Sequence, residues 1–580
     1  MRCEVKVLLV GINAKYIHSN LAIQSLKAYA GKYKENIEIV EYTINHYKDF
    51  ILGDIFKKKP DIIGFSCYIW NIELVTGIMT ELHKVLPNTQ IWLGGPEVSY
   101  RPNELLKEYP YIKGIAVGEG EKSFLNLMEH YIDDQSSLKE IRGIVYQDEN
   151  GTIISNPVAE IMDMSTIPFP YQELDKFKNR IIYYESSRGC PFSCSYCLSS
   201  VEKRVRFRNV ELVKEELKHL LDCKVPQVKF VDRTFNCDHK HTIEIWGFLK
   251  ENDNGITNFH FEIAADLLNE EELDLIASMR PGLIQLEIGV QSTNPETLKA
   301  IDRTMDLSKL TRIVEKINKK ENIHQHLDLI AGLPYENYES FGHSFNQVYA
   351  MRPNQLQLGF LKLLSGTVMD QKKEEYNIVY QEFPPYEVLY TKWLSFDELL
   401  RLKNVEEMVE VYYNSNQFIY GLKYLEKLFE TPFELYEKLA DFYESKGFFE
   451  LKHNRIDRYF HLFEFAKEFT KANDEIGYQA FSQLLVFDLY LRENIKSRPS
   501  FAEDESEYKE FVRRFYEEQE KENTLLPDYL GYNSKQMSRM THIEKFCINP
   551  FTMKKEETYI LFDYKNRNPL TYEARTLEIH

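Results

Sequence analysis

Residues 181–197 read IIYYESSRGCPFSCSYC, a short apolar run followed by a loop with three cysteines. Cys190, Cys194 and Cys197 have the spacing C-x3-C-x2-C. Three thiolates on one tight loop can hold three irons of a [4Fe–4S] cluster and leave the fourth iron open. A zinc site is disfavoured, because zinc usually takes four ligands from two C-x2-C pairs, and no second pair follows.

The sequence around this loop alternates strand and helix patterns. The run before the loop and the runs at 227–232, 258–265, 283–290, 324–334 and 354–363 predict six strands with helices between them. We therefore expect a partial (β/α)6 barrel over residues 176–365. Its functional groups should lie at the carboxyl-terminal rim of the strands.

A second α/β series precedes the barrel. Apolar, Val/Ile-rich runs at 5–13, 37–44, 61–69, 90–95 and 112–119 predict a flavodoxin-like, doubly wound parallel sheet over residues 1–140. Residues 141–175 are expected to form a linker or hairpin. Ligands of such sheets bind at the carboxyl ends of the strands. The candidate contacts there are Asn13, His18, Ser66, Trp70, Asn71, Gly94, Gly95, Pro96, Gly118 and Glu119.

These loops leave two interpretations open. No GxGxxG motif is present, so a dinucleotide is disfavoured. Each glycine, taken alone, is explained by a tight turn between strand and helix. Four such loops on one edge favour a ligand.

The last third of the chain has a different pattern. Residues 366–580 are expected to be mainly α-helical, with a terminal β-hairpin around Asn566-Arg567-Asn568-Pro569. Cys547 precedes the hairpin, and we consider it both as a catalytic candidate and as a buried structural thiol.

Composition limits the classes of partner. The 580 residues carry a net charge of −19, which disfavours general nucleic-acid binding. The basic segment 203–208, KRVRFR, is therefore interpreted as a structural or cofactor contact. No uncharged apolar run is long enough to span a bilayer, and residues 1–13 are too charged for a signal peptide. The expected compartment is the cytoplasm.

The cysteine loop, with Tyr196 before the last cysteine, resembles the radical S-adenosylmethionine (SAM) superfamily. The doubly wound domain resembles the cobalamin-binding domain of cobalamin-dependent members. The segments KYIHSNLA, GGPE, VGEGE, DRTFN and EIGVQS are similar to one branch with a long helical C-terminal extension.

The resemblance implies the cofactors and the reaction. A [4Fe–4S] cluster on the three cysteines would bind SAM and cleave it reductively, giving a radical that abstracts a substrate hydrogen. Cobalamin, bound at the glycine-rich edge, would deliver a methyl group to an unactivated carbon. An external electron donor such as flavodoxin or ferredoxin, and a small-molecule or peptide substrate, are implied as partners.

The resemblance also assigns SAM contacts. They are Tyr196, Asp232, Arg233, Glu262, Gln291, Arg303, Gly332 and Pro334. The usual Gly-Gly-Glu turn is replaced by Asp-Arg-Thr-Phe-Asn at 232–236, which leaves the contacts of that turn open. Arg303 suits a carboxylate geometrically, but a solvated arginine at a helix end is equally compatible. Glu287 alternates with apolar residues within a strand, so we consider it a catalytic candidate inside the barrel.

One family pattern is missing. The motif Asp-x-His-x-x-Gly, whose histidine binds cobalt in many cobalamin enzymes, is absent, because Tyr16 and Leu21 replace its Asp and Gly. We therefore do not assign His18 as the cobalt ligand. Many radical SAM members bind cobalamin without such a histidine.

Three other functions remain to be weighed against methyl transfer. The first is a radical rearrangement or cyclisation with the same cofactors. The second is methylthio transfer, which is disfavoured because Cys3 and Cys67 are too few to hold a second cluster. The third is a non-catalytic cobalamin or iron–sulfur sensor, which would not need the SAM contacts.

Overall fold

The computed structural model describes residues 5–469, 475–495, 498–502, 504, 506 and 508–579. It divides into two compact units. The first contains residues 1–323, 330–337 and 359–395, and the second contains 324–329, 338–358 and 396–580.

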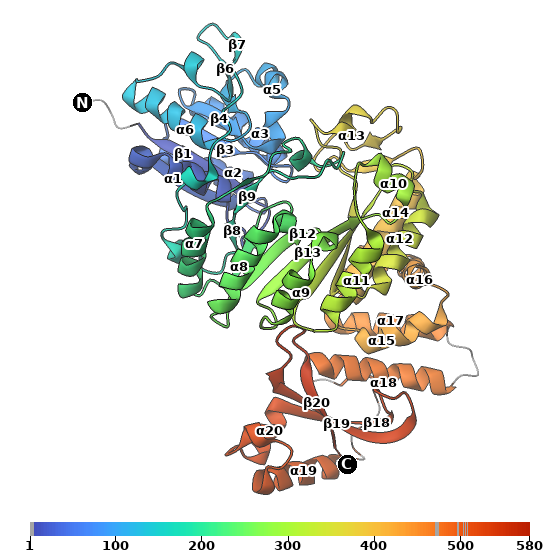
Figure 1. Ribbon diagram of the computed structural model, residues 1–580. Helices are drawn as coiled ribbons and strands as arrows, with labels where there is room; N and C mark the ends of the chain where they lie inside the picture. The colour runs from blue at the N-terminus through green and yellow to red at the C-terminus, as the bar shows by residue number, and fades with distance from the viewer. Residues whose placement is uncertain are drawn as a thin grey trace. The chain divides into compact units, whose positions relative to one another are not determined.

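The N-terminal part of the first unit is a seven-stranded sheet with the order β2-β1-β3-β4-β5-β6-β7 (Figure 1). Its parallel strands are β1 (Val7–Asn13), β2 (Ile37–Thr43), β3 (Ile62–Ser66), β4 (Gln90–Gly94) and β5 (Ile112–Ala116). The hairpin of β6 (Ile144–Gln147) and β7 (Ile153–Ser155) continues the sheet in antiparallel direction from β5. The sequence predicted the five parallel strands and a linker or hairpin, but not the pairing of that hairpin with the sheet.

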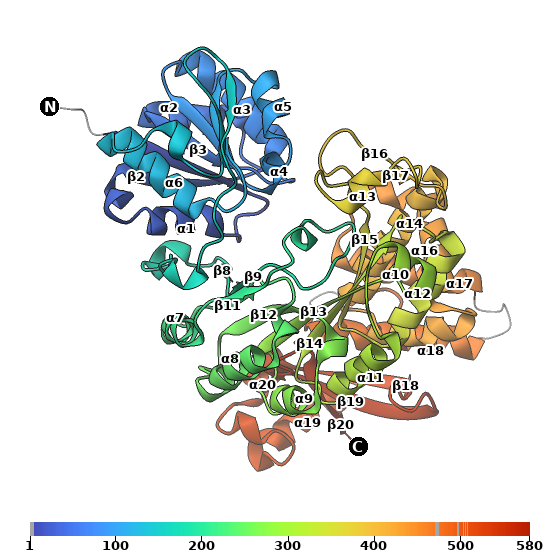
Figure 2. The same ribbon diagram turned by 45° about the horizontal axis from the view of Figure 1, so that its top comes forward.

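Alternation within β1 explains why both faces of this sheet are covered. Leu8 and Val10 pack in a core with α2 (Lys48–Lys58) and α3 (Ile72–Val85), whereas Val7 and Leu9 pack in a core with α1 (Leu21–Tyr29) and α6 (Glu121–Met128). Figure 2 shows the two helix pairs on opposite faces. The doubly wound architecture is confirmed.

The barrel is one six-stranded sheet with the order β15-β14-β13-β12-β11-β8, as expected for a partial (β/α)6 barrel. Its strands are β8 (Ile182–Tyr184), β11 (Gln227–Phe230), β12 (Asn258–Ile263), β13 (Ile284–Gln291), β14 (His324–Ala331) and β15 (Gln355–Phe360). The crossover helices are α7 (Val210–Asp222), α8 (His239–Glu251), α9 (Glu270–Ala277), α10 (Pro295–Ala300), α11 (Leu307–Asn318) and α12 (Tyr338–Ala350). Side-chain caps start several of them; Asn269, for example, forms a capping box with Glu272.

Two short elements of the first unit follow the barrel strands. They are α13 (Val368–Gln371) and the antiparallel pair of β16 (Val379–Tyr380) and β17 (Val388–Tyr390). The predicted helical pattern begins only after this pair.

The second unit is mainly helical, as expected. Its larger helices are α14 (Phe396–Met408), α15 (Ile419–Leu425), α16 (Pro432–Ser445), α17 (Arg455–Phe469), α18 (Glu475–Arg492), α19 (Lys509–Glu522) and α20 (Ser534–Met540).

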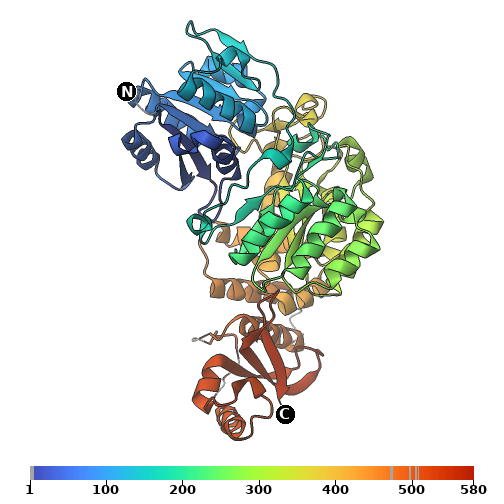
Figure 3. The same cartoon turned by 60° about the vertical axis from the view of Figure 1, so that its left-hand side comes forward.

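Its terminal sheet has three antiparallel strands, β18 (Thr541–Ile548), β19 (Lys555–Arg567) and β20 (Ala574–Ile579), seen in red in Figure 3. One face of the sheet packs on α18 and the other on α19 and α20. The sequence predicted the β19–β20 hairpin and missed β18.

No helix among the described residues is both long enough and apolar enough to cross a membrane.

Candidate active site

The cysteine loop is fixed by backbone contacts. It follows β9 (Ser187–Arg188), which pairs with β10 (Arg206–Phe207). Gly189 has φ +99°, and a Cβ there would lie 2.5 Å from the Arg204 carbonyl oxygen, so only glycine fits. The Cys190 amide donates to the Glu202 carbonyl at 3.3 Å, and the Ser195 amide donates to the Ile301 carbonyl at 2.9 Å.

The chemistry of the three thiols suits an iron–sulfur cluster. Cys190 and Cys194 are buried, and Cys197 is partly exposed. Burial raises the pKa of the Cys194 thiol, as do the neighbouring Cys190 and Cys197, whereas the Arg303 guanidinium opposes this shift. Arg303 Nη1 lies 3.6 Å from Cys194 Sγ. A buried cation next to a thiol favours the thiolate that binds iron.

Gln291 and Arg303 meet beside this loop. Gln291 ends β13 with φ +73°, and its buried Oε1 has no hydrogen-bond partner. Arg303 donates through Nη2 to the Gly289 carbonyl, while its buried Nε has no partner. One unpaired acceptor and one unpaired donor next to the thiols fit a ligand with both amino and carboxylate groups. Arg303 is only partly exposed, and the contact of these two side chains with the methionine end of SAM remains a prediction.

Asp232 is engaged by the turn that leads into the cysteine loop, and its contact with SAM remains a prediction. It is 1% exposed, and its two carboxylate oxygens accept hydrogen bonds from the Ser186 amide, the Ser186 hydroxyl and the Ser187 hydroxyl at 2.5–3.0 Å. Burial raises the pKa of Asp232 to about 6, and the serine hydrogen bonds limit the rise. The side chain therefore fixes the turn from β8 into the cysteine loop.

The other SAM candidates lie on several barrel elements. Tyr196 is within the cysteine loop, and Arg233 is exposed after β11. Glu262 of β12 is in register with Glu287 of β13. Gly332 has φ +88°, and a Cβ there would lie 2.7 Å from Val388 of β17; Pro334 follows it and is buried. Their contacts with SAM remain predictions.

Glu287 belongs to a polar cluster within the barrel strands. Its Oε2 accepts from Lys229 Nζ of β11 at 3.0 Å and contacts His260 Nε2 of β12 at 2.8 Å. Burial alone would raise the pKa of Glu287, but the hydrogen bond with His260 and the Lys229 charge lower it to about 2. Glu287 is therefore a carboxylate at neutral pH.

Lys229 and His260 were not predicted from the sequence. The available signal is alternation: both are polar residues in apolar strands, as Glu287 is. The strand register that aligns Lys229 with His260 could not be known without the structure.

Cys547, the other catalytic candidate, lies in β18 of the second unit, where its amide donates to Gln483 Oε1 at 2.9 Å. Its catalytic role remains a prediction.

Two asparagine side chains link the loops at the carboxyl edge of the N-terminal sheet. Asn13 Nδ2 donates to the His18 carbonyl at 3.0 Å and to Glu41 Oε2 at 2.6 Å. Asn71 Nδ2 donates to the carbonyls of Ile12 and Ser66 at 3.0 and 2.9 Å. These bonds hold the loops after β1 and β3 together, so both asparagines position the edge.

The same edge presents backbone and aromatic surface to a ligand. Gly95 has φ +115°, and a Cβ would collide with the Cys67 carbonyl; it follows Gly94 and precedes Pro96, the first residue of α4 (Pro96–Ser99). Gly118 has φ +80° and open space beside it. Trp70 is 45% exposed, stacks on Tyr68 at 4.4 Å and donates to the Ile12 carbonyl. The edge thus offers an exposed aromatic ring after β3 and unobstructed glycine backbone after β5, and their contact with cobalamin remains a prediction.

Two of the predicted cobalamin contacts connect this sheet to the barrel. Glu119 forms ion pairs with Arg206 and, at 3.5 Å, with Arg188. Burial alone would raise the pKa of Glu119, but the two arginines lower it. His18 Nδ1 lies 2.7 Å from Tyr183 Oη of β8. Burial, Lys15 and Lys229 lower the pKa of His18. Both side chains thus already have partners in the barrel, and their contact with cobalamin remains a prediction.

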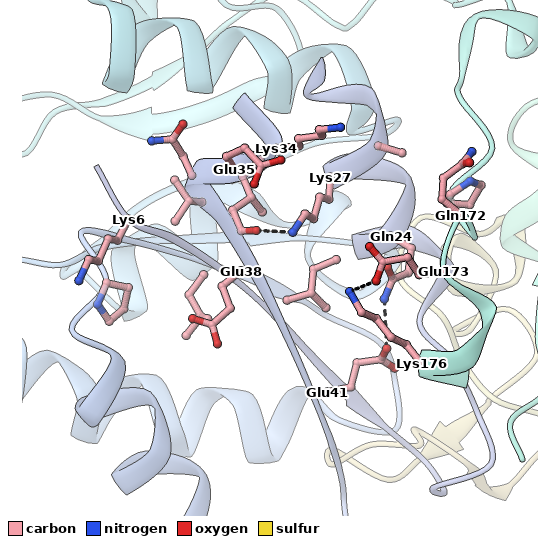
Figure 4. Close-up of a pocket in the computed structure, with 18 of the residues that line it drawn as sticks. Lys6, Gln24, Lys27, Lys34, Glu35, Glu38, Glu41, Gln172, Glu173 and Lys176 are labelled. Atoms are coloured by element: carbon pink, nitrogen blue, oxygen red, sulfur yellow. Dashed lines mark hydrogen bonds and ion pairs between the residues drawn. The ribbon is translucent and has the colours of Figure 1, made fainter. Parts of the chain in front are cut away.

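A cavity of about 950 Å³ lies over the edge strand β2, away from the carboxyl ends of the strands (Figure 4). Lys27 Nζ donates there to the Ile37 carbonyl at 2.6 Å, and Lys176 pairs with Glu173. Lys58 pairs there with Glu38, and Arg180 pairs with Glu41.

Family models match all three regions of the chain. The description "B12 binding domain" matches residues 7–128, and "Radical SAM superfamily" matches 184–348. A third family, described as "Protein of unknown function (DUF4080)", matches 374–562.

Relatives share the first two regions. An uncharacterized methyltransferase from Pyrococcus horikoshii, PH0819, is 30% identical over 310 residues, which are 50% of this chain and 65% of that protein. The cobalamin-dependent radical SAM methyltransferase TokK from Streptomyces tokunonensis is 25% identical over 49% of this chain and 44% of its own length. The chain thus spans between 44% and 65% of the length of these relatives.

A solved structure has the same fold. The cobalamin-dependent radical SAM enzyme OxsB, with aqua-cobalamin and SAM bound, superposes with a TM-score of 0.57 at 18% identity. The match covers 84% of this chain and 80% of OxsB. The domain matches confirm the predicted cofactor classes, namely SAM with an iron–sulfur cluster, and cobalamin. The chain therefore contains a B12-binding domain followed by a radical SAM domain.

Proposed function

We propose that this protein is a cobalamin-dependent radical SAM methyltransferase that methylates an unactivated carbon of a small molecule or peptide. One observation carries the proposal: the cysteine loop has polar neighbours on both sides within one compact unit. On one side lie the unpaired Oε1 of Gln291 and the unpaired Nε of Arg303. On the other side, Arg188 forms an ion pair with Glu119 in the loop after β5. The two cofactor-binding edges are therefore connected by direct contacts.

Each site residue would have a distinct role in the proposed reaction. Cys190, Cys194 and Cys197 would hold a [4Fe–4S] cluster, and Gln291 and Arg303 would bind the amino-acid end of SAM. When bound, the cluster and SAM supply hydrogen abstraction from carbon, and cobalamin supplies a transferable methyl group. Asp232 holds the turn that carries the cysteine loop, and Arg303 favours the Cys194 thiolate.

The first test is the cofactor content. We expect anaerobic reconstitution with iron, sulfide and hydroxocobalamin to give about four irons and one cobalt per chain. Four irons without cobalt would contradict the methyl-transfer proposal. About eight irons would instead favour a methylthiotransferase.

The second test separates the reaction outcomes. With dithionite and SAM, the reconstituted protein should form 5′-deoxyadenosine, and trideuteromethyl-SAM should transfer its label to the product. Unlabelled product would indicate a rearrangement or cyclisation. A protein that binds both cofactors but never cleaves SAM would be a sensor.

A further inference from the structure

A small exposed surface borders the cysteine loop. We call it the loop-rim surface and define it by Tyr100, Val201, Lys203, Arg204 and Val368. Val201, Tyr100 and Val368 are 52%, 41% and 38% exposed, and Lys203 and Arg204 are also exposed. Exposed apolar side chains that gather in one place can mark a protein interaction site, particularly where polar residues surround them.

Backbone contacts tie this surface to the iron–sulfur site. Segment 202–204 lies directly on the loop, because Glu202 accepts from the Cys190 amide and the Arg204 carbonyl closes on Gly189. On the other side, the Met369 amide donates to the Ser195 carbonyl at 2.8 Å, which places Val368 next to the loop.

Tyr100 completes the surface. Its ring packs against Gly366, which brings Tyr100 beside the segment that carries Val368. Cys197 is the partly exposed thiol of the three. A partner that covered the loop-rim surface would therefore approach the cluster at its accessible side.

The charges favour an acidic partner. Arg206, two residues further on, is engaged by Glu119, and Arg208 is engaged by Glu216. Among the described residues, Lys203 and Arg204 form no ion pair that would neutralise them. Two free cations on a chain with a net charge of −19 make this a local basic site on an acidic protein.

We propose that the loop-rim surface is the docking site for an acidic one-electron carrier protein. The inference rests on the proposed function, which requires a reduced cluster. One electron passes from the reduced carrier, which is oxidised, to the oxidised cluster, which is reduced. Lys203 and Arg204 guide and hold the carrier, and Tyr100, Val201 and Val368 make the apolar contact.

The test compares two charge reversals in the reconstituted full-length protein. One variant carries Lys203→Glu and Arg204→Glu. The control carries Lys319→Glu and Lys320→Glu, which make the same change in charge on exposed residues after α11. Reduction of the cluster by an acidic flavodoxin is followed by stopped-flow absorbance, and binding of the oxidised flavodoxin by fluorescence anisotropy.

At low ionic strength, we expect the Lys203/Arg204 variant to bind flavodoxin at least about tenfold more weakly than the unmodified protein. The rate at which flavodoxin reduces its cluster should fall by a similar factor. Both differences should shrink in high salt. The control should behave like the unmodified protein. Equal binding and reduction in both variants would overturn the proposal.

Dithionite separates this outcome from failure of the proposed function. Both variants should be reduced normally by dithionite, because it needs no docking site. If even the unmodified protein with dithionite forms no 5′-deoxyadenosine, the proposed function fails, whereas the binding comparison still tests the docking site. If the reversal reduces iron content, the milder Lys203→Gln and Arg204→Gln variant replaces it, with about half the effect expected.

Discussion

At the residue scale, Gln291 combines strain with an unpaired polar atom. A non-glycine residue with φ +73° costs on the order of 1 kcal/mol, and its Oε1 is buried without a partner. Such a combination persists where a ligand compensates for it. We infer that the conformation of Gln291 lowers the stability of the fold and is retained because it places the side chain to bind SAM.

The variant Gln291→Gly tests this inference. We expect its free energy of unfolding to stay equal or rise by up to about 1 kcal/mol, because glycine adopts positive φ without strain. The affinity for SAM should fall about tenfold in equilibrium binding. Glu321→Gly, at an exposed non-glycine residue with positive φ, is the control for strain alone. A less stable Gln291→Gly variant with normal SAM affinity would contradict the inference.

Asp488 of α18 predicts a pH dependence in the second unit. Burial raises the pKa of Asp488 to about 8, although the amides of Tyr420 and Gly421 donate to it at 3.0 and 2.8 Å. The folded state therefore keeps a proton that the unfolded state loses above its ordinary pKa of 3.8. The free energy of unfolding should fall by about 1.4 kcal/mol for each pH unit between these two values.

Hydrogen exchange at the Tyr420 and Gly421 amides measures this effect, with protection decreasing as the pH rises from about 4 to 8 after correction for the intrinsic rate. Asp488→Asn, which cannot ionise, should be independent of pH in this range. The same slope in both proteins would show that another group titrates.

At the element scale, the loop after β5 and the pair of β9 and β10 are joined by charges. Arg188 contacts Glu119, Glu121 and Glu185, and Arg206 contacts Glu119. Their side chains are 7–23% exposed, so solvent screens these pairs less than it screens surface pairs. We propose that this network positions the cobalamin edge relative to the cysteine loop.

Glu119→Gln should uncouple the two cofactors. We expect at least about a threefold rise in the ratio of 5′-deoxyadenosine formed to substrate methylated, while the iron content and the dithionite reduction stay unchanged. The control is Glu202→Gln, which removes a more exposed partner of Arg206. A parallel loss of both products would instead indicate a purely structural role.

At the scale of the whole molecule, the two units are interleaved along the chain. The second unit includes residues 338–358 as well as 396–580. Within it, Phe345 and Tyr349 of α12 contact Phe433 and Tyr436 of α16. A C-terminal fragment that began at residue 396 would lack α12. The rings of Phe433 and Tyr436 on α16 would then lose their partners and be exposed to solvent.

We therefore expect fragment 396–580 to aggregate, because an uncovered aromatic face favours association. Fragment 338–580 should be more soluble in size-exclusion chromatography and show a cooperative thermal transition. Equal solubility of the two fragments would show that α12 is dispensable for this core.

The sequence alone determined the order of the folds and pointed to the three candidate cluster ligands. Strand and helix periodicity is local, and three cysteines within eight residues are a local signal, so the two α/β series and Cys190, Cys194 and Cys197 could be identified without coordinates. Gln291 and Arg303 were predicted through the resemblance, and the structure places Arg303 beside Cys194. The hairpin of β6 and β7 lay within the predicted linker or hairpin, but its pairing with β5 was not predicted, and β18 was missed.

Only the tertiary structure decided which polar residues meet. Asp232, for example, accepts hydrogen bonds from Ser186 and Ser187, some 45 residues earlier in the chain. Glu119 and His18 similarly reach Arg206 and Tyr183 of the barrel. The cluster of Lys229, His260 and Glu287 depends on the register of three parallel strands. Register and long-range ion pairs are set by packing across the whole unit, and no local pattern encodes them.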